Sequence, residues 1–512
     1  MPKKLAWLPI LICGIISIVV LFPSWMANPN TKVIEGYGDG FKAYHAILYH
    51  AKYDSTYSWY EGMNYPYGEH VVPGASQPLI SNGMRLLEDV GIPIADYGWA
   101  VVHFSILFGI VIAMLFTFLL LQRMGVRWWL ATLAALTMTL MAPQIDRIIA
   151  HYGLAHPEVL PAVLYYLKRW DEKPGWLPAL AVALCVWLFS QIHFYYFAIL
   201  AFSIGGFLAA RWLILTFLPF TTFKEKWAAG TFWQSIPSSI FNHALALFLM
   251  FGLPAIYFFT WFGFTDPVID RNEAPWGFFT FLTGPLGILT SHTQPYWQWF
   301  HGKVDTFYPG FEGWAYIGLP AVVFIFWILG RAINRRIRKG SDPEQQKEIS
   351  SSNSNDRSES SFLHSRAQDS LYLHSLLLAA FGVLIFSFAV PIKQLGGEAL
   401  LEYLGPLRQF RSIGRFAWLF YYAINLALFV ELEFAVRRSK QNRWWLLPLL
   451  FTLVFAFYEV HNFWQAKDFR LDEVVGLNEP TLAEKTGLDF DEYQAIIPVP
   501  YYNIGSDNFW WE

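Results

Sequence analysis

Charged residues are scarce in this chain: only 15% of its 512 residues are Asp, Glu, Lys or Arg, whereas 55% are hydrophobic. One soluble core cannot cover that much apolar surface, so a wholly soluble protein is excluded. Cysteine is rare too, since Cys13 and Cys185 are the only two and both lie in hydrophobic runs. A disulfide framework and a cysteine-based metal cluster are therefore not expected.

Several binding motifs are also absent. The chain contains no Walker-type GxxxxGK sequence, no GxGxxG between a strand and a helix, and neither HExxH nor paired CxxC spacing. It shows no convincing internal repeat either. We expect no nucleic-acid partner, and any metal site would have to use other ligand spacings.

Hydrophobic runs are abundant instead. Crossing the hydrocarbon of a bilayer takes about 17 to 25 apolar residues, and about eleven segments approach this length. They lie near residues 5–26, 99–121, 127–143, 155–169, 176–193, 195–217, 239–261, 313–331, 370–391, 412–434 and 444–462. The fourth and fifth are the weakest, being short or broken by proline. The predicted fold is an all-α polytopic membrane protein.

Lys and Arg are concentrated in every second connection between the predicted spans. They precede the first predicted span and follow the second, fourth, sixth, eighth and tenth: Lys3, Lys4, Arg123, Arg127, Lys168, Arg169, Lys173, Lys224, Lys226, Arg331, Arg335, Arg336, Arg338, Lys339, Arg437, Arg438, Lys440 and Arg443. The positive-inside rule then places the N-terminus in the cytoplasm and the C-terminus outside. The first run exceeds the apolar stretch of a signal peptide and lacks a clear cleavage site, so we expect an uncleaved anchor.

The connections differ greatly in length. Within a transmembrane domain at 1–462, the long outer segments are 28–98 and 262–312, and the long inner segment 331–369 is serine-rich and predicted to be disordered. Loops this long and aromatic are typical of functional sites, so any chemistry is expected outside. The remaining residues, 463–512, form a polar extracytoplasmic tail.

Two stretches of the outer segments have helical character. Residues 84–90 are predicted to form a short amphipathic helix, and 277–290 a surface-lying or re-entrant one.

A carboxylate between two glycines follows the first span, in "EGYGDGFKAYHAILYH" at 35–50. The glycines allow a ligand or backbone to approach Asp39 closely, and a carboxylate at the membrane exit is a candidate general base. The sequence turns helical directly after Asp39, however, and Asp is a favoured N-cap residue. The spacing by itself favours the cap.

The outward turn "PQIDRIIAHYGLAHPE" at 143–158 is crowded with ionisable groups. Its charged and histidine side chains are expected to face a wet cavity rather than lipid. His156 and Glu158, together with His193 of "QIHFYYF", could bind a divalent cation. Ordinary hydrogen bonding of interfacial histidines is the alternative.

Three arginines occur in "GPLRQFRSIGRFAW" at 405–418, on the side where cations are otherwise scarce. Arg408, Arg411 and Arg415 are spaced to share one face of a helix. Their forked guanidiniums suit a phosphate or pyrophosphate. Alternatively they reach lipid headgroups or pair with carboxylates of the first outer loop.

These features resemble the GT-C glycosyltransferase superfamily of bacterial membrane proteins and the YfhO-like bacterial membrane proteins. The resemblance covers nearly the whole chain. It rests on GDG at 38–40, MNYPYGEHV at 63–71, QPL at 77–79, IHFYYF at 192–197, EGWAYIGLP at 312–320, LRQFRSIGRF at 407–416 and YQAIIPVPYYNIGSDNF at 493–509.

The resemblance implies a GT-C-like fold and roles for particular residues. Asp39 becomes the catalytic base, and Arg408, Arg411 and Arg415 become a clamp for a lipid phosphate. His193 and Glu312 match recurrent motif positions that bind substrate or shape its cavity. The chain departs from this family in two ways: residues 144–157 lack an Asp-x-Asp pair, which puts metal dependence in doubt, and relatives tend to continue into an extracytoplasmic domain that the tail would only begin.

The expected function is therefore hexosyl transfer at the outer face of a bacterial plasma membrane. The donor would be a polyprenyl-phosphate-linked sugar, the acceptor an envelope glycan, lipid or protein, and the other partner the bilayer. Two alternatives stay open: a transporter or flippase of an anionic lipid-linked substrate, and a non-catalytic assembly protein. A transporter predicts ionisable groups deep within several spans.

Overall fold

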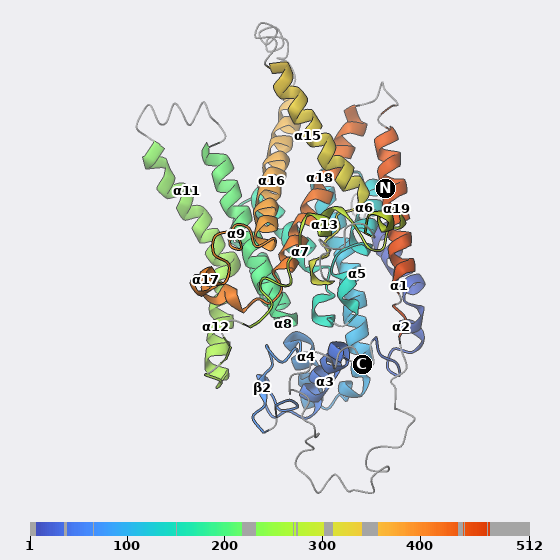
Figure 1. Cartoon of the computed structure of the whole chain (residues 1–512), viewed down its shortest axis with the longest axis vertical. Helices are drawn as coiled ribbons and strands as arrows, with labels where there is room; N and C mark the ends of the chain where they lie inside the picture. The colour runs from blue at the N-terminus through green and yellow to red at the C-terminus, as the bar shows by residue number, and fades with distance from the viewer. Residues whose placement is uncertain are drawn as a thin grey trace.

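The computed structural model describes residues 7–34, 38–64, 66–149, 151–217, 232–269, 271–272, 275–301, 311–339, 357–438, 444, 446–467 and 469–471. This part of the chain is helical, apart from an antiparallel pair of two-residue strands, β1 (Trp59–Tyr60) and β2 (Glu69–His70). The all-α prediction is confirmed. A helical bundle fills the upper part of Figure 1, and the first outer segment lies beneath it.

Six helical segments are long and apolar enough to cross a membrane: Ile94–Arg123, Phe194–Phe217, Ile240–Thr265, Asp369–Ser387, Ile413–Arg437 and Leu446–Ala466. Four apolar helices are shorter: Leu8–Leu21, Trp128–Leu140, Trp176–Ile192 and Leu319–Asn334. The chain is thus a helical membrane protein, but eleven full-length spans are not confirmed. Breaks in the backbone shorten several helices; the helix before His193, for example, ends where that residue becomes extended.

The principal elements of the bundle, with their bounds, are α1 (Leu8–Leu21), α5 (Gly98–Arg123), α6 (Trp128–Leu140), α7 (Val159–Glu172), α8 (Trp176–Ile192), α9 (Phe194–Phe217), α11 (Phe232–Leu247), α12 (Leu253–Thr265), α15 (Leu319–Lys339), α16 (Arg357–Ser387), α18 (Trp418–Arg438) and α19 (Leu446–Ala466). A single π-helical stretch at 248–252 joins α11 to α12.

The fourth predicted span corresponds to α7, which is buried in the bundle and is not among the apolar segments described above. Two of its charged side chains lie inside the protein. Nζ of Lys168 lies 2.6 Å from Oδ1 of Asp369, and Oδ1 of Asp171 lies 2.6 Å from Nε of Arg211. A buried charge is tolerated when a partner of opposite sign compensates it. α7 is therefore a core helix that is covered by the rest of the protein.

The segment predicted to be the first outer one, 28–98, packs α3 (Gly38–Lys52) against α4 (Pro78–Asp89). Apolar residues at helical spacing, such as Ala43 and Ile47, are buried on α3. The amphipathic helix predicted at 84–90 is the second half of α4, so its helical character is confirmed.

The side chain of His50 joins α3 to α4. Its Nδ1 lies 2.5 Å from Oδ2 of Asp54, and its Nε2 lies 2.7 Å from Oδ1 of Asn82. The other oxygen of Asp54 accepts a 2.9 Å hydrogen bond from the backbone N–H of Glu61. Since the side chains of His50 and Asp54 are fully buried, this pair holds the segment together from within.

The inner segment 331–369, predicted to be disordered, is helical in both of its described parts. α15 continues to Lys339, and α16 already begins at Arg357. Arg and Lys have high helix propensity, so a helix can extend beyond its apolar stretch. The prediction of disorder is wrong for these parts, and 340–356 lie outside the described residues.

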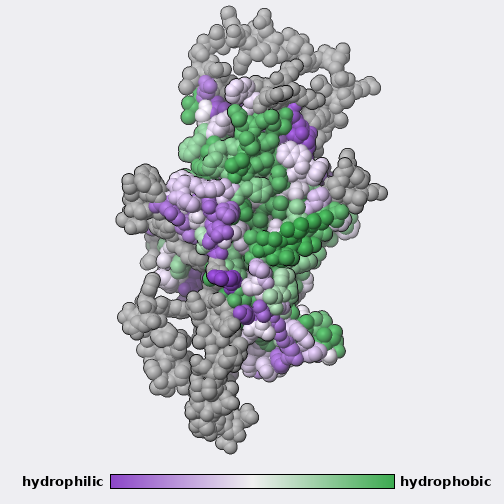
Figure 2. All heavy atoms as spheres, turned by 90° about the vertical axis from the view of Figure 1, so that its right-hand side faces the viewer, coloured by the Kyte–Doolittle hydropathy of each residue, from purple (hydrophilic) through white to green (hydrophobic). Residues whose placement is uncertain are grey.

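Large apolar side chains are exposed on the outer helices of the bundle. On the face shown in Figure 2, hydrophobic residues cover much of the upper and middle part, and hydrophilic ones gather at the left of the middle part and below. α1 exposes Ile15, Ile16, Val19 and Val20, and α19 exposes Leu446, Leu447, Leu450 and Val454. Exposed apolar surface of this extent is typical of contact with lipid.

We predict that His50→Ala loosens the first outer segment, because it leaves the buried carboxylate of Asp54 unpaired. Breaking a buried pair typically costs about 3 kcal/mol of unfolding free energy. Hydrogen–deuterium exchange of the amides of α3 and α4 measures the effect. Lys52→Ala is the matched control on the same helix, because the pair of Lys52 with Asp96 is exposed and contributes little. Equal amide exchange in the two variants would contradict the stabilising role assigned to the buried pair of His50 and Asp54.

Candidate functional site

The carboxylate of Glu312 is the centre of a buried ionic cluster. It lies in a 3-10 turn at Phe311–Gly313, just before α15. Nε and Nη2 of Arg415 each donate to one of its oxygens at 2.7 Å. This two-pronged geometry is the strongest arrangement of an arginine and a carboxylate. Arg415 also stacks on Tyr195, with 4.3 Å from its guanidinium carbon to the ring centroid.

The outward turn at 143–158 supplies two more partners of Glu312. Arg147 lies in a 3-10 turn at Ile145–Ile148, and its Nη1 lies 3.3 Å from Oε2 of Glu312. Nε2 of His151 lies 3.3 Å from Oε1. The side chain of Arg147 is fully buried, whereas that of His151 is 29% exposed. A ligand could therefore reach these ionic groups from the side on which His151 lies.

We name the residues Arg147, His151, Glu312 and Arg415 the Glu312 cluster. Two guanidiniums share one carboxylate, so the cluster carries one positive charge in excess even with His151 neutral. A buried positive excess attracts an anionic group, and guanidiniums match phosphate oxygens in geometry.

A glycine allows the cluster to assemble. A Cβ atom on Gly414 would come within 3.0 Å of the backbone of Leu282 and Thr283, and within 3.1 Å of the carbonyl oxygen of Glu312. Cβ contacts with backbone atoms are rarely this short, so glycine eases the close approach of the turn at 413–417 to Glu312.

The pKa values of the cluster reflect burial and charge. Burial by itself would raise the pKa of Glu312, but the hydrogen bond to His151 and the charges of Arg147 and Arg415 hold it well below its usual range. Burial lowers the pKa of Arg147, and Glu312 opposes this shift. Both groups stay charged at neutral pH, since an arginine pKa starts above 12.

His193 lies at the break between α8 and α9, next to this cluster. Burial is the largest cause that lowers its pKa, to about 3, and the charge of Arg415 adds to the effect. A Cβ on Gly153 would come within 3.0 Å of the His193 ring. His193 is thus a neutral imidazole packed against the turn that carries His151.

His156 and Glu158 lie deeper, at the start of α7. Nδ1 of His156 lies 2.9 Å from Oε1 of Glu158, and both residues are buried. Gly109 of α5 leaves room for the Glu158 carboxylate. Within the described ranges, no group of three or more His, Cys, Asp or Glu side chains could hold a metal ion. The structure therefore brings His156 and Glu158 together, but without a metal-ligand set around them.

The three arginines of 405–418 do not form a stripe on one helix face. Gly405 has a positive φ of 55° inside a 3-10 helix at Glu402–Gln409, and α18 begins only at Trp418. Arg415 is buried on Glu312, Arg411 is exposed with its Nε 3.0 Å from the carbonyl oxygen of Trp276, and Arg408 is half-buried. The prediction of one helical face is wrong, because non-helical backbone at Phe410 and Ser412 separates the three arginines from one another.

Asp39 is exposed in the first turn of α3. Because α3 already begins at Gly38, Asp39 lies inside the helix and the prediction that it is the N-cap is wrong; a carboxylate in the first turn still interacts favourably with the helix dipole. Tyr44, about 7.5 Å further along the helix axis, packs against Tyr152 with 4.9 Å between ring centroids. Since Tyr152 follows His151 directly, α3 lies next to the Glu312 cluster.

The sequence did not single out Arg147, His151 or Tyr195 as site residues. A signal for the first two was present, since both belong to the crowded turn at 143–158. Tyr195 is one of many aromatic residues, and nothing in its spacing marks it as the partner of Arg415.

We predict that Glu312→Gln lowers the unfolding free energy by about 3 kcal/mol at pH 7, because two buried guanidiniums lose their counter-charge. The folded-state pKa of Glu312 lies below the ordinary value of about 4.3, so its contribution is complete above that pH and is lost as the pH falls below it. Thermal unfolding of both proteins at several pH values measures this.

The difference between wild type and Glu312→Gln should shrink as the pH falls from about 5 to 3. Glu402→Gln, which changes an exposed carboxylate, is the control. A difference that stays constant over this range would contradict the assigned charge state of Glu312.

One protein family matches most of the chain, from residue 11 to residue 460; it is described as "Domain of unknown function (DUF6311)". Comparison with curated proteins and with solved structures gives no match. The matched range includes the bundle, the first outer segment and all members of the Glu312 cluster. The chain therefore belongs to the DUF6311 family.

Proposed function

We propose that this protein transfers a hexose from a polyprenyl-phosphate donor to an envelope glycan, lipid or protein acceptor at the outer face of a bacterial plasma membrane. The observation that carries this proposal is the positive excess of the Glu312 cluster, beside the exposed side of His151. Arginines whose orientation is fixed by a carboxylate suit the phosphate of such a donor.

In the proposed reaction, the hydroxyl oxygen of the acceptor attacks the anomeric carbon of the sugar. The bond between that carbon and the phosphate oxygen breaks, and polyprenyl phosphate leaves with the electron pair. Asp39 takes the acceptor proton, and Arg411 with the Glu312 cluster offsets the charge on the leaving phosphate. Such a displacement inverts the anomeric centre.

The proposal assigns supporting roles to the remaining residues. His193 shapes the wall beside His151, and Arg408 approaches the headgroup of the donor from the same connection as Arg411. His156 and Glu158 hold the turn at 143–158 in place. The topology follows the charge distribution, with the N-terminus in the cytoplasm and the chemistry outside.

Transport or flipping of an anionic lipid-linked substrate is the second candidate, and one observation favours it. Glu459 is buried within the span Leu446–Ala466, as expected for a residue on a transport path. Its carboxylate, however, accepts hydrogen bonds from Tyr316 and from the backbone N–H of Leu319, at 2.5 and 3.0 Å. These bonds tie α19 to the start of α15, so a structural role accounts for it and transfer is the better proposal.

The catalytic role of Asp39 is tested by Asp39→Asn in proteoliposomes that contain polyprenyl-phosphate hexoses and a membrane extract as acceptor. Losing a general base typically lowers the rate by about 100-fold or more. Asp96→Asn is the control, because Asp96 is an exposed carboxylate of the same segment. Transfer by Asp39→Asn at the rate of the control would refute the assignment, and flipping of the labelled donor without transfer would favour the second candidate.

The phosphate-binding role is tested separately by Arg411→Gln. Because Arg411 is exposed and makes its hydrogen bond to a backbone carbonyl, we expect unchanged thermal stability and about tenfold weaker binding of short-chain polyprenyl phosphate. A titration followed by native mass spectrometry measures the affinity, and a thermal unfolding curve measures the stability, with Arg169→Gln as the control cation. Equal affinity in the two variants would contradict the role of Arg411.

A further inference from the structure

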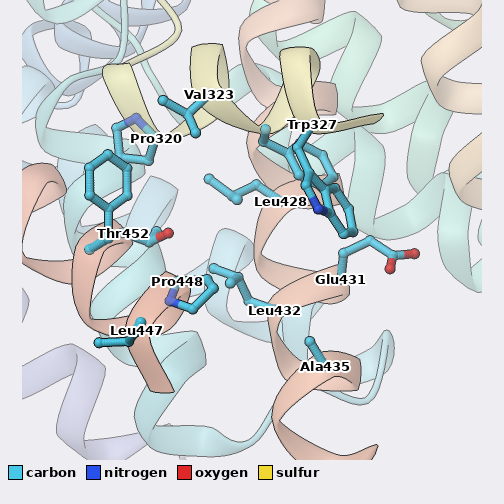
Figure 3. Close-up of a pocket in the computed structure, with 12 residues that line it drawn as sticks. Pro320, Val323, Trp327, Leu428, Glu431, Leu432, Ala435, Leu447, Pro448 and Thr452 are labelled. Atoms are coloured by element: carbon cyan, nitrogen blue, oxygen red, sulfur yellow. The ribbon is translucent and has the colours of Figure 1, made fainter. Parts of the chain in front are cut away.

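An apolar cavity of about 390 Å³ lies between α15, α18 and α19 (Figure 3). Its wall consists mainly of apolar side chains, among them Val323, Leu428, Leu432 and Phe451. The carboxylate of Glu431 lies at one edge, beside Trp327, and points away from the apolar side chains. Ligand sites in proteins typically have volumes of about 300 to 1,000 Å³, so the cavity can hold part of an apolar chain.

A second cavity, of about 510 Å³, adjoins the first between α15, α16 and α18. The two share Phe324, Trp327 and Glu431 in their linings. The second is more polar, because Arg331, His374 and Asp369 also line it. Together the cavities form one amphipathic site, with an apolar end and a charged end.

Glu431 is an unusual residue for its position. It is exposed on the protein surface but lies within the span Ile413–Arg437, about 9 Å along the helix from the end of that span. In the described part of the chain it forms no ion pair or hydrogen bond, whereas Glu433, two residues later, pairs with Arg127 and Arg437 at 2.8 and 2.5 Å. A carboxylate at membrane depth is costly unless a cation compensates it.

The other charge of the site is Arg331. Its guanidinium carbon lies 4.6 Å from the ring centroid of Trp327, and among the described residues it too has no carboxylate partner. Arg331 lies near the end of the apolar segment Leu319–Asn334 and lines the same cavity as Glu431. The third charged residue of the lining, Asp369, is compensated by Lys168 at 2.6 Å. The charged end of the site thus presents one cation, Arg331, and one anion, Glu431, that are not paired with each other.

We propose that this site binds a phospholipid whose headgroup carries both a phosphate and a primary ammonium, of the phosphatidylethanolamine type. The phosphate pairs with Arg331, the ammonium donates hydrogen bonds to Glu431, and one acyl chain enters the apolar cavity. This inference uses none of the residues of the proposed transfer reaction, so the lipid site and the transfer reaction are tested independently.

The charge pattern distinguishes this lipid from the other common ones. Phosphatidylglycerol offers no cation to Glu431, so the carboxylate would face an anionic headgroup. Phosphatidylcholine carries a quaternary ammonium without N–H groups, so it cannot donate a hydrogen bond to the carboxylate. We therefore expect the order of affinity to be phosphatidylethanolamine, then phosphatidylcholine, then phosphatidylglycerol.

The test is native mass spectrometry of the delipidated, full-length protein, titrated with dioleoyl-phosphatidylethanolamine, -phosphatidylcholine and -phosphatidylglycerol. The wild type should bind the phosphatidylethanolamine about tenfold more tightly than the phosphatidylglycerol, as expected for one charged hydrogen-bonded contact. Glu431→Gln should abolish this preference and still bind lipid. Arg331→Gln should weaken the binding of all three.

Two control variants change exposed charges outside the site, Glu402→Gln and Arg169→Gln, and both should bind like the wild type. Circular dichroism confirms that each variant retains its helices. Equal binding of the three lipids by the wild type, or an ethanolamine preference that survives Glu431→Gln, would overturn the proposal and leave only non-selective contact with the bilayer.

Discussion

The contact between Glu312 and Arg415 is the constraint on which the outer end of the bundle depends. It joins the turn before α15 to the turn before α18, and Arg147 and His151 connect it to the turn before α7. These three connections are far apart in sequence and lack regular α-helix at the point of contact. A shared buried carboxylate holds them in one place, because each guanidinium left without it would be a buried, unpaired charge.

The first outer segment is attached to the same region by polar contacts. Tyr44 of α3 lies 2.5 Å from Nε2 of His103 in α5 and also packs against Tyr152. Further away, His70 of β2 hydrogen bonds at 3.0 Å to Thr265, at the end of α12. The segment therefore covers the outer end of the bundle, where the Glu312 cluster lies.

Ionisable groups are arranged differently at the two ends of the bundle. At the end that carries the Glu312 cluster, buried ionisable groups contact one another within the protein. At the other end, Arg331 and Glu431 lie near the boundary of the apolar segments without partners in the described chain, beside cavities rather than packed side chains. The bilayer is the natural source of partners there, since its headgroups carry fixed charges at the same depth.

The sequence by itself determined the helical membrane class, because long apolar runs with few charges have no other stable environment. It also marked the turns at 143–158 and 405–418 as rich in ionisable groups. Only the tertiary structure decided which of these meet: Arg415 with Glu312 and Arg147, but not Arg408 or Arg411 on a common helix face. Side-chain spacing predicts neighbours only within regular helices. The segment 405–418 leaves helical geometry at Phe410 and Ser412, and the close backbone approach at Gly414 brings its end to Glu312.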